Sequence, residues 1–135
     1  MAVVVGYVLT KEGRAALRRA SEECLLRQTK LIVINSNRGG KDFDATDARR
    51  FEAELVAVQS QLDEVGVEHE VRQLVRGNDP VQDLIEVADE VNADFIVIGL
   101  RKRTPLGKLF LGSNAQRILL EASCPVLAVK ADADN

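Results

Sequence analysis

The chain has 135 residues, a length typical of one domain, and we expect residues 1–135 to form a single domain. Hydrophobic residues make up 46% and charged residues 29%, as in soluble globular proteins. The net charge of −3 gives no overall attraction for nucleic acid, and only 4% of residues are aromatic. A base-stacking surface for single-stranded nucleic acid is therefore excluded, and we expect no nucleic-acid partner.

No apolar run approaches the roughly 20 residues that cross a membrane. The first residues, MAVVVGYVLTKEG, lack the positive charge that precedes the apolar run of a secretory signal. The two cysteines, Cys24 and Cys124, fit no metal-binding spacing and are expected to be small core residues. These features predict a cytoplasmic chain with no membrane partner and no disulfide framework.

Strands and helices alternate in the first half of the sequence. The Val-rich run Ala2–Val8 and the run Leu31–Ile34 are typical of strands that are buried on both faces. Between them, Lys11–Leu26 carries apolar residues at three- and four-residue steps, which predicts a helix with the preceding threonine as its N-cap. After a polar loop, Asn35–Asp44, the same periodicity predicts a helix over Thr46–Val65.

The second half continues the alternation. Asp79 and Pro80 have the residue types expected at the N-cap and first position of a helix. This order of elements predicts an α/β fold, an open parallel sheet with helices on both faces. The remaining expected elements are a strand near the sheet edge at Val67–Val75, a helix over 80–91, a strand at Phe95–Gly99, a helix from Ser113 or Asn114 to Ala122, and a strand at Val126–Val129.

The loop from Gly99 to Ser113 holds the clearest binding chemistry. In open parallel sheets ligands bind beyond the carboxyl ends of the strands, and this loop begins there, directly after Ile98. It ends on Gly112, Ser113 and Asn114 at a helix start, where free backbone N–H groups and the helix dipole favour an anion. Its cations are Arg101, Lys102, Arg103 and Lys108. The pattern predicts a phosphate site, with a solvated basic loop as the alternative.

The same loop resembles the nucleotide-binding motif G-x2-G-x9-G-[S/T] of the universal stress protein family. Gly99 and Gly112–Ser113 stand at the motif's separations, and the ending PVLAV at 125–129 is similar to the family's last strand. The order of elements also agrees over the whole chain. The resemblance implies a Rossmann-like five-stranded sheet of order 3-2-1-4-5. It also implies a homodimer paired along the last strand, through Val126, Leu127, Ala128 and Val129.

The resemblance further implies an ATP or AMP site. Gly99 and Gly112 would allow close approach of the ligand, and the residues after Gly112 would donate hydrogen bonds to phosphate. By the same analogy, Asn35 and Ser36 after the second strand would face the base. The expected nucleotide-binding residues are Val8, Ser36, Ile98, Gly99, Lys102, Gly112, Ser113 and Asn114, with Arg101, Arg103 and Lys108 as a phosphate patch.

Two positions depart from the family pattern. The second glycine of the motif falls at Lys102, and the aspartate that ends the first strand of nucleotide binders is Val8 here. Without the aspartate the site lacks one polar anchor for the nucleoside, whereas Lys102 would contact phosphate directly. Two functions stay open: a universal stress-type regulatory domain that binds ATP or AMP, and a nucleotide-free dimeric interaction module.

The sequence offers little for catalysis. The single histidine, His69, lies between Glu68 and Glu70 on the expected edge strand and is interpreted as a solvent-exposed residue. No serine stands in a nucleophile motif, and the aspartates at 42, 44 and 47 are interpreted as a cluster at a helix start. We therefore expect no metal site and no efficient enzyme, with weak ATP hydrolysis as an open alternative.

Overall fold

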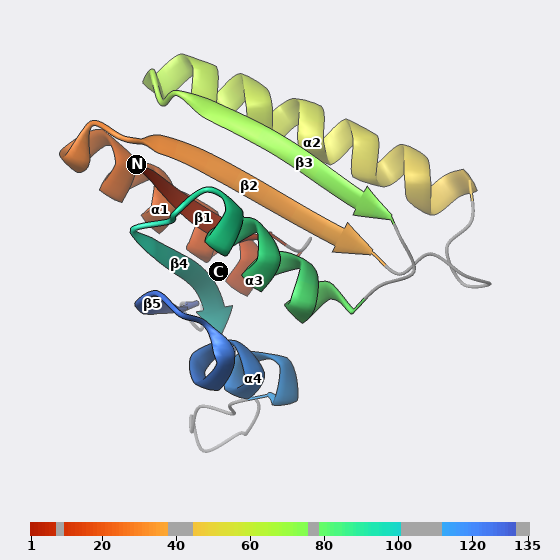
Figure 1. Ribbon diagram of the computed structural model, residues 1–135. Helices are drawn as coiled ribbons and strands as arrows, with labels where there is room; N and C mark the ends of the chain where they lie inside the picture. Colours follow the sequence, from red (N-terminus) through yellow and green to blue (C-terminus); the bar gives the residue numbers. More distant parts are fainter. Residues whose placement is uncertain (8–9, 38–44, 76–78, 101–111, 132–135) are drawn as a thin grey trace.

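The computed structural model describes residues 1–7, 10–37, 45–75, 79–100 and 112–131. Five parallel strands form a sheet in the order β3-β2-β1-β4-β5, which confirms the predicted 3-2-1-4-5 order (Figure 1). The strands are β1 (Ala2–Gly6), β2 (Lys30–Asn37), β3 (His69–Val75), β4 (Phe95–Leu100) and β5 (Val126–Lys130).

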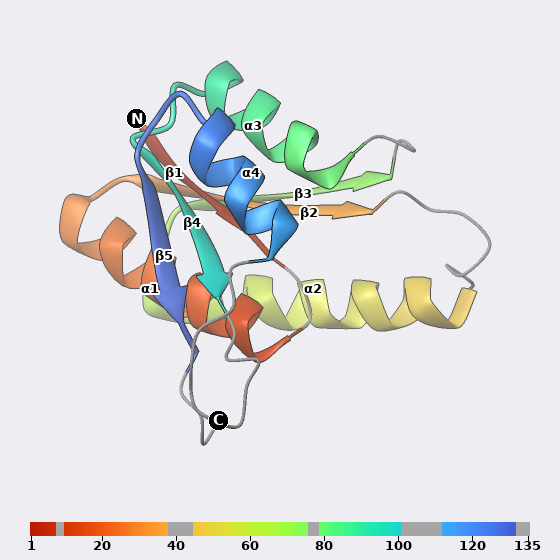
Figure 2. The same ribbon diagram turned by 90° about the horizontal axis from the view of Figure 1, so that it is seen from below.

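Helices cover both faces of this sheet, as expected for a Rossmann-like α/β fold. Figure 2 shows the helices on opposite sides of the sheet. None of the described helices is long and apolar enough to cross a membrane. One face carries α1 (Lys11–Arg27) and α2 (Ala45–Val65), and the other carries α3 (Pro80–Glu90) and α4 (Ser113–Glu121).

Side chains that alternate along each strand build two separate cores. In β1, Val3 and Val5 pack toward α1 and α2, whereas Ala2 and Val4 pack toward α3 and α4. All four are buried, because the sheet is covered on both sides. Burying a valine contributes on the order of 1.5–3 kcal/mol to stability, so this double burial explains why β1 reads as a continuous apolar run.

The two N-caps expected from the sequence are present. The Thr10 hydroxyl oxygen accepts from the backbone N–H of Gly13 at 3.1 Å, and the Asp79 carboxylate accepts from the N–H of Val81 at 3.0 Å. Each cap satisfies one of the N–H groups that a helix start leaves without an internal partner. The starts of α1 and α3 are therefore specified locally.

The strand β2 extends further than the sequence predicted. Residues 35–37 were expected in a loop, but they pair with residues 73–75 of β3, beyond the point where β1 ends. The Asn35 side chain is buried, and its amide donates to the carbonyl oxygen of Tyr7 at 3.0 Å. Pairing with a long neighbour strand thus overrides the low strand propensity of Asn and Ser.

The expectation of an exposed His69 is wrong. The residue begins the edge strand β3 as predicted, but its side chain is only 13% exposed. Its ring Nδ1 lies 2.8 Å from the carbonyl oxygen of Val67, and its Nε2 lies 3.8 Å from an Asp63 carboxylate oxygen. The imidazole folds back over the preceding turn because polar partners are available there.

The two cysteines differ in burial. Cys24 is 2% exposed within the core beneath α1 and α2, which confirms its predicted place, and burial raises the pKa of its thiol to about 11. Cys124 is partly exposed and packs against the margin of the other core, where burial also raises its pKa. The core prediction thus holds for Cys24 and only in part for Cys124.

Gly99, near the end of β4, lies against the first turn of α1. A Cβ atom at this position would stand 2.1 Å from the backbone carbonyl oxygen of Glu12, closer than any real contact. Gly99 does not have a positive φ, so close approach and not backbone conformation requires glycine here. The glycine was expected to leave room for a ligand, but α1 occupies the space beside it.

We expect Gly99→Ala to lower the free energy of unfolding by about 1–3 kcal/mol, because a rigid backbone group must move to admit the methyl group. Gly6→Ala is the matched control. Its Cβ would meet only the flexible end of Leu84 at 3.2 Å, so its cost should stay below about 1 kcal/mol. Urea denaturation of both variants measures the difference. Equal losses would contradict this account of Gly99.

Candidate functional site

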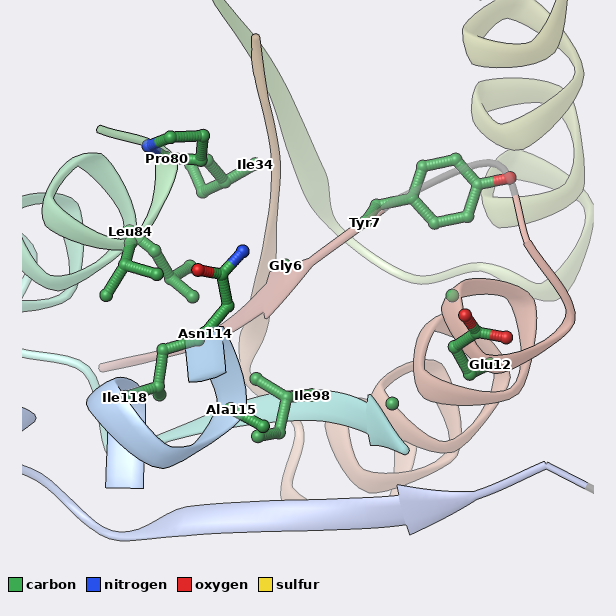
Figure 3. Close-up of a pocket in the computed structure, with 13 residues that line it drawn as sticks. Gly6, Tyr7, Glu12, Ile34, Pro80, Leu84, Ile98, Asn114, Ala115 and Ile118 are labelled. Atoms are coloured by element: carbon green, nitrogen blue, oxygen red, sulfur yellow. The ribbon is translucent and has the colours of Figure 1, made fainter. Parts of the chain in front are cut away.

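A pocket of about 240 Å³ opens at the carboxyl ends of β1 and β4 (Figure 3). It lies where the first turns of α1, α3 and α4 meet the sheet, the region in which open parallel sheets bind ligands. Its lining residues come from all of these elements and from β2: Gly6, Tyr7, Glu12, Gly13, Ile34, Pro80, Val81, Leu84, Ile98, Gly99, Asn114, Ala115 and Ile118.

The pocket wall is mainly apolar, with two polar side chains at its rim. Figure 3 shows the Asn114 amide extending from the first turn of α4 toward Gly6, with the Glu12 carboxylate on the first turn of α1. The ring of Tyr7 points away from the pocket toward α2, so this residue lines the pocket with its backbone. An apolar cavity with a few placed polar groups is typical of small-molecule sites.

Three helix N-termini meet at this pocket, and one of them differs from the others. The starts of α1 and α3 are capped by side chains, but α4 begins at Gly112 with no side-chain cap. The backbone N–H groups of Ser113 and Asn114 therefore have no partner within the helix. Such N–H groups and the positive end of a helix dipole are the features by which helix starts bind anions in proteins.

An ion pair joins the starts of α3 and α4. The Asp79 carboxylate that caps α3 also contacts the guanidinium of Arg117, which lies one turn into α4. The hydrogen bond to Asp79 raises the pKa of Arg117, and Glu121 lies 3.4 Å from the same side chain. This contact fixes the α4 N-terminus beside Pro80 and Val81, which line the pocket.

A second contact holds the end of β1. The Tyr7 hydroxyl donates to a Glu54 carboxylate oxygen on α2 at 2.9 Å, and Arg14 of α1 lies 3.7 Å from the same oxygen. Burial raises the pKa of Tyr7 above its ordinary value, and the bond to Glu54 raises it further. The phenol thus stays protonated and ties β1 to α2 directly behind the pocket.

The structure brings together only some of the predicted site residues. Ile98, Gly99 and Asn114 line the pocket, and Gly112 and Ser113 lie at the α4 start beside it. Asn35, expected to face a base, is buried, bonds to Tyr7 and is not among the described lining residues. Ser36 lies within β2, paired with residue 74 of β3. Five predicted residues lie outside the described residues: Val8, Arg101, Lys102, Arg103 and Lys108.

Several lining residues were missed by the sequence analysis. The start of α1 contributes Glu12 and Gly13, and the start of α3 contributes Pro80 and Leu84. The sequence carried a usable signal for them, since every helix that follows a parallel strand begins at the same edge of the sheet. The N-cap positions of α1 and α3 thus marked the pocket, although they were read only as helix boundaries.

Comparison with known proteins shows which family the chain resembles. The model of the universal stress protein family matches residues 1–130. A universal stress protein of Mycolicibacterium smegmatis is 46% identical over 128 residues, covering 95% of this chain and 96% of that protein.

Solved structures agree with this match. A universal stress protein from Archaeoglobus fulgidus has a TM-score of 0.83 at 38% identity, covering 96% of this chain and 98% of that one. The universal stress protein from the same organism in complex with dAMP has a TM-score of 0.77 at 33% identity, with the same coverage of both chains.

The two roles of Asp79 can be separated by substitution. Asp79→Asn keeps a cap acceptor but removes the charge that faces Arg117, so its cost should be at most about 1 kcal/mol. Asp79→Ala also removes the cap and should cost about 1 kcal/mol more. Thermal and urea unfolding of both variants measure this order. Equal costs for the two variants would show that the cap contributes nothing.

Proposed function

Because the chain belongs to the universal stress protein family, we propose that it is a regulatory domain that binds an adenine nucleotide in the pocket at the carboxyl ends of β1 and β4. The observation that carries the proposal is the α4 start, which has no side-chain cap and reaches the pocket through Asn114 and Ala115. Free N–H groups at a helix start bind phosphate.

The pocket suggests how the nucleotide lies. The phosphate would accept from the N–H groups of Ser113 and Asn114, close to Gly112, and the base would pack on the apolar wall that includes Ile34 and Ile98. Among adenine nucleotides we favour a monophosphate over ATP. The A. fulgidus protein that binds dAMP, a nucleoside monophosphate, supports the same choice.

Residues outside the described part of the chain complete the proposal. Lys102, with the neighbouring cations Arg101, Arg103 and Lys108, would add positive charge near the phosphate. Val8 replaces the aspartate of the family pattern, so another acceptor must serve the ribose hydroxyls. The Glu12 carboxylate lines the pocket and has the chemistry for this role.

The alternative proposal is a dimeric interaction module that binds no nucleotide. Val8 in place of the family's aspartate and Lys102 in place of the motif's second glycine both favour it. It requires the same fold and the same family membership. The two proposals differ only in whether the pocket is occupied, and a binding measurement decides between them.

We propose a regulatory role and not a catalytic one. His69 begins β3, at the opposite end of the strands from the pocket, so no histidine among the described residues can act there as a base. Within the same residues no group of His, Cys, Asp and Glu side chains could hold a metal ion. The adenine nucleotide would then act as a signal that changes stability or assembly.

A homodimer paired along β5 belongs to the same proposal. This strand is at the sheet edge, and Ala128 and Lys130 are exposed. Edge strands present unpaired backbone groups that readily pair with another chain. On α4, which precedes β5 in the chain, Leu119 is 42% and Leu120 is 84% exposed. A second copy would cover this apolar surface as well as the strand edge.

Calorimetry tests the nucleotide site. We expect AMP and dAMP to bind, and Gly112→Val to weaken binding at least about tenfold, because its side chain blocks the approach of phosphate to the helix start. The φ of −64° at Gly112 suits any residue, so the variant should fold. Ala53→Val, on the exposed surface of α2, is the control and should bind normally. No saturable binding at ~10 mM nucleotide would favour the nucleotide-free module.

Light scattering coupled to size-exclusion chromatography tests the dimer. We expect Leu120→Glu to shift the chain toward monomer, because it buries a charge in the proposed interface. Leu26→Glu is the matched control, since Leu26 is an equally apolar helix residue that is 78% exposed at the end of α1. A monomeric wild-type chain, or equal effects of both substitutions, would exclude this interface.

A further inference from the structure

A second cleft lies between α1 and β5, away from the nucleotide pocket. Its volume is about 170 Å³, and α1 and β5 run side by side there (Figure 2). One wall comes from α1 and the other from the end of β5: Lys11, Ala15, Arg18, Arg19 and Glu22 on α1, and Val129, Lys130 and Ala131 opposite. The one carboxylate among these lining residues, on Glu22, pairs with Arg19 at 3.2 Å. Ala15 lies between the cations, and its short side chain leaves space for the hollow.

Three of the four lining cations of this cleft have no carboxylate within 4 Å among the described residues. Arg14, Arg27, Arg72 and Arg117 each lie within 4 Å of a carboxylate, and so does Arg19 at the rim of the cleft. Among the described residues, the lysines and arginines without such a partner are Lys11, Arg18, Lys130, Arg49 and Arg50. Three of these five gather around one hollow in a chain whose net charge is −3.

The position of Lys11 adds a second observation. It is the first residue of α1, where the helix dipole is positive and a cation is unfavourable. Arg18 follows two helical turns later and faces the same cleft, and Lys130 adds a further like charge from β5. A bound anion would relieve both the mutual repulsion and the unfavourable dipole.

We infer that this cleft is a binding site for a small condensed-phosphate anion, separate from the proposed nucleotide site. Three cations around a hollow of about 170 Å³ suit a compact anion that carries several phosphate oxygens. Phosphate oxygens would accept from the Lys11 and Lys130 ammonium groups and from the forked guanidinium of Arg18. Free pyrophosphate and the diphosphate end of a nucleotide share this chemistry.

Calorimetry with inorganic pyrophosphate at constant ionic strength tests the site. The cleft variant Lys11→Gln/Arg18→Gln should weaken binding at least about tenfold. The matched control Arg49→Gln/Arg50→Gln removes the same charge from exposed, unpaired arginines on α2 and should change binding by less than about twofold. Both variants alter only exposed side chains, and circular dichroism checks that they fold.

Two further titrations identify the ligand and the place where it binds. Gly112→Val blocks the proposed phosphate site at the α4 start and should leave the part of pyrophosphate binding that depends on Lys11 and Arg18. ADP titrated into the same variant shows whether a nucleotide's diphosphate can use the cleft, whereas adenosine should not bind there. The inference is overturned by no saturable binding of pyrophosphate at ~10 mM. Equal losses in the two double variants also overturn it, as does the absence of any further loss when Lys11→Gln/Arg18→Gln is added to Gly112→Val.

Discussion

The end of β4 packs closely on the start of α1, because Gly99 has no side chain to hold it away from the Glu12 carbonyl group. This contact decides where α1 begins relative to the sheet. It places Glu12 and Gly13 on the pocket wall, and it lets Tyr7, at the end of β1, pass on the opposite side of the strand and bond to α2. The geometry of the pocket therefore depends on a packing contact more than on any polar group.

The three helix N-termini beside that contact are not capped in the same way. Thr10 and Asp79 occupy the N-terminal N–H groups of α1 and α3, whereas the start of α4 has no such side chain. Asp79 also pairs with Arg117. The carboxylate that caps α3 therefore also helps to position the N-terminus of α4. The pocket thus has one helix start with no N-cap side chain, among walls that are otherwise apolar or capped.

The sequence predicted the fold well because its signals were local or periodic. Thr10 and Asp79 predicted the starts of two helices, and apolar runs predicted where the strands lie in the sequence. The errors arose where partners distant in sequence decide the outcome: β3 extends β2 past Asn35, and the carbonyl of Val67 draws in His69. Gly99 belongs to the same group, since only the assembled fold shows that α1 fills the space beside it.

The burial of Cys24 has a consequence for the chemistry of the core. A thiol with a pKa of about 11 is ionised in only about one molecule in 10⁴ at neutral pH, and the thiolate is the form that oxidants and electrophiles attack. The residue is also only 2% exposed, within the core cluster that contains Phe95 of β4. The centre of the domain is therefore protected against oxidative modification for as long as it stays folded, and damage to this cysteine would report prior unfolding.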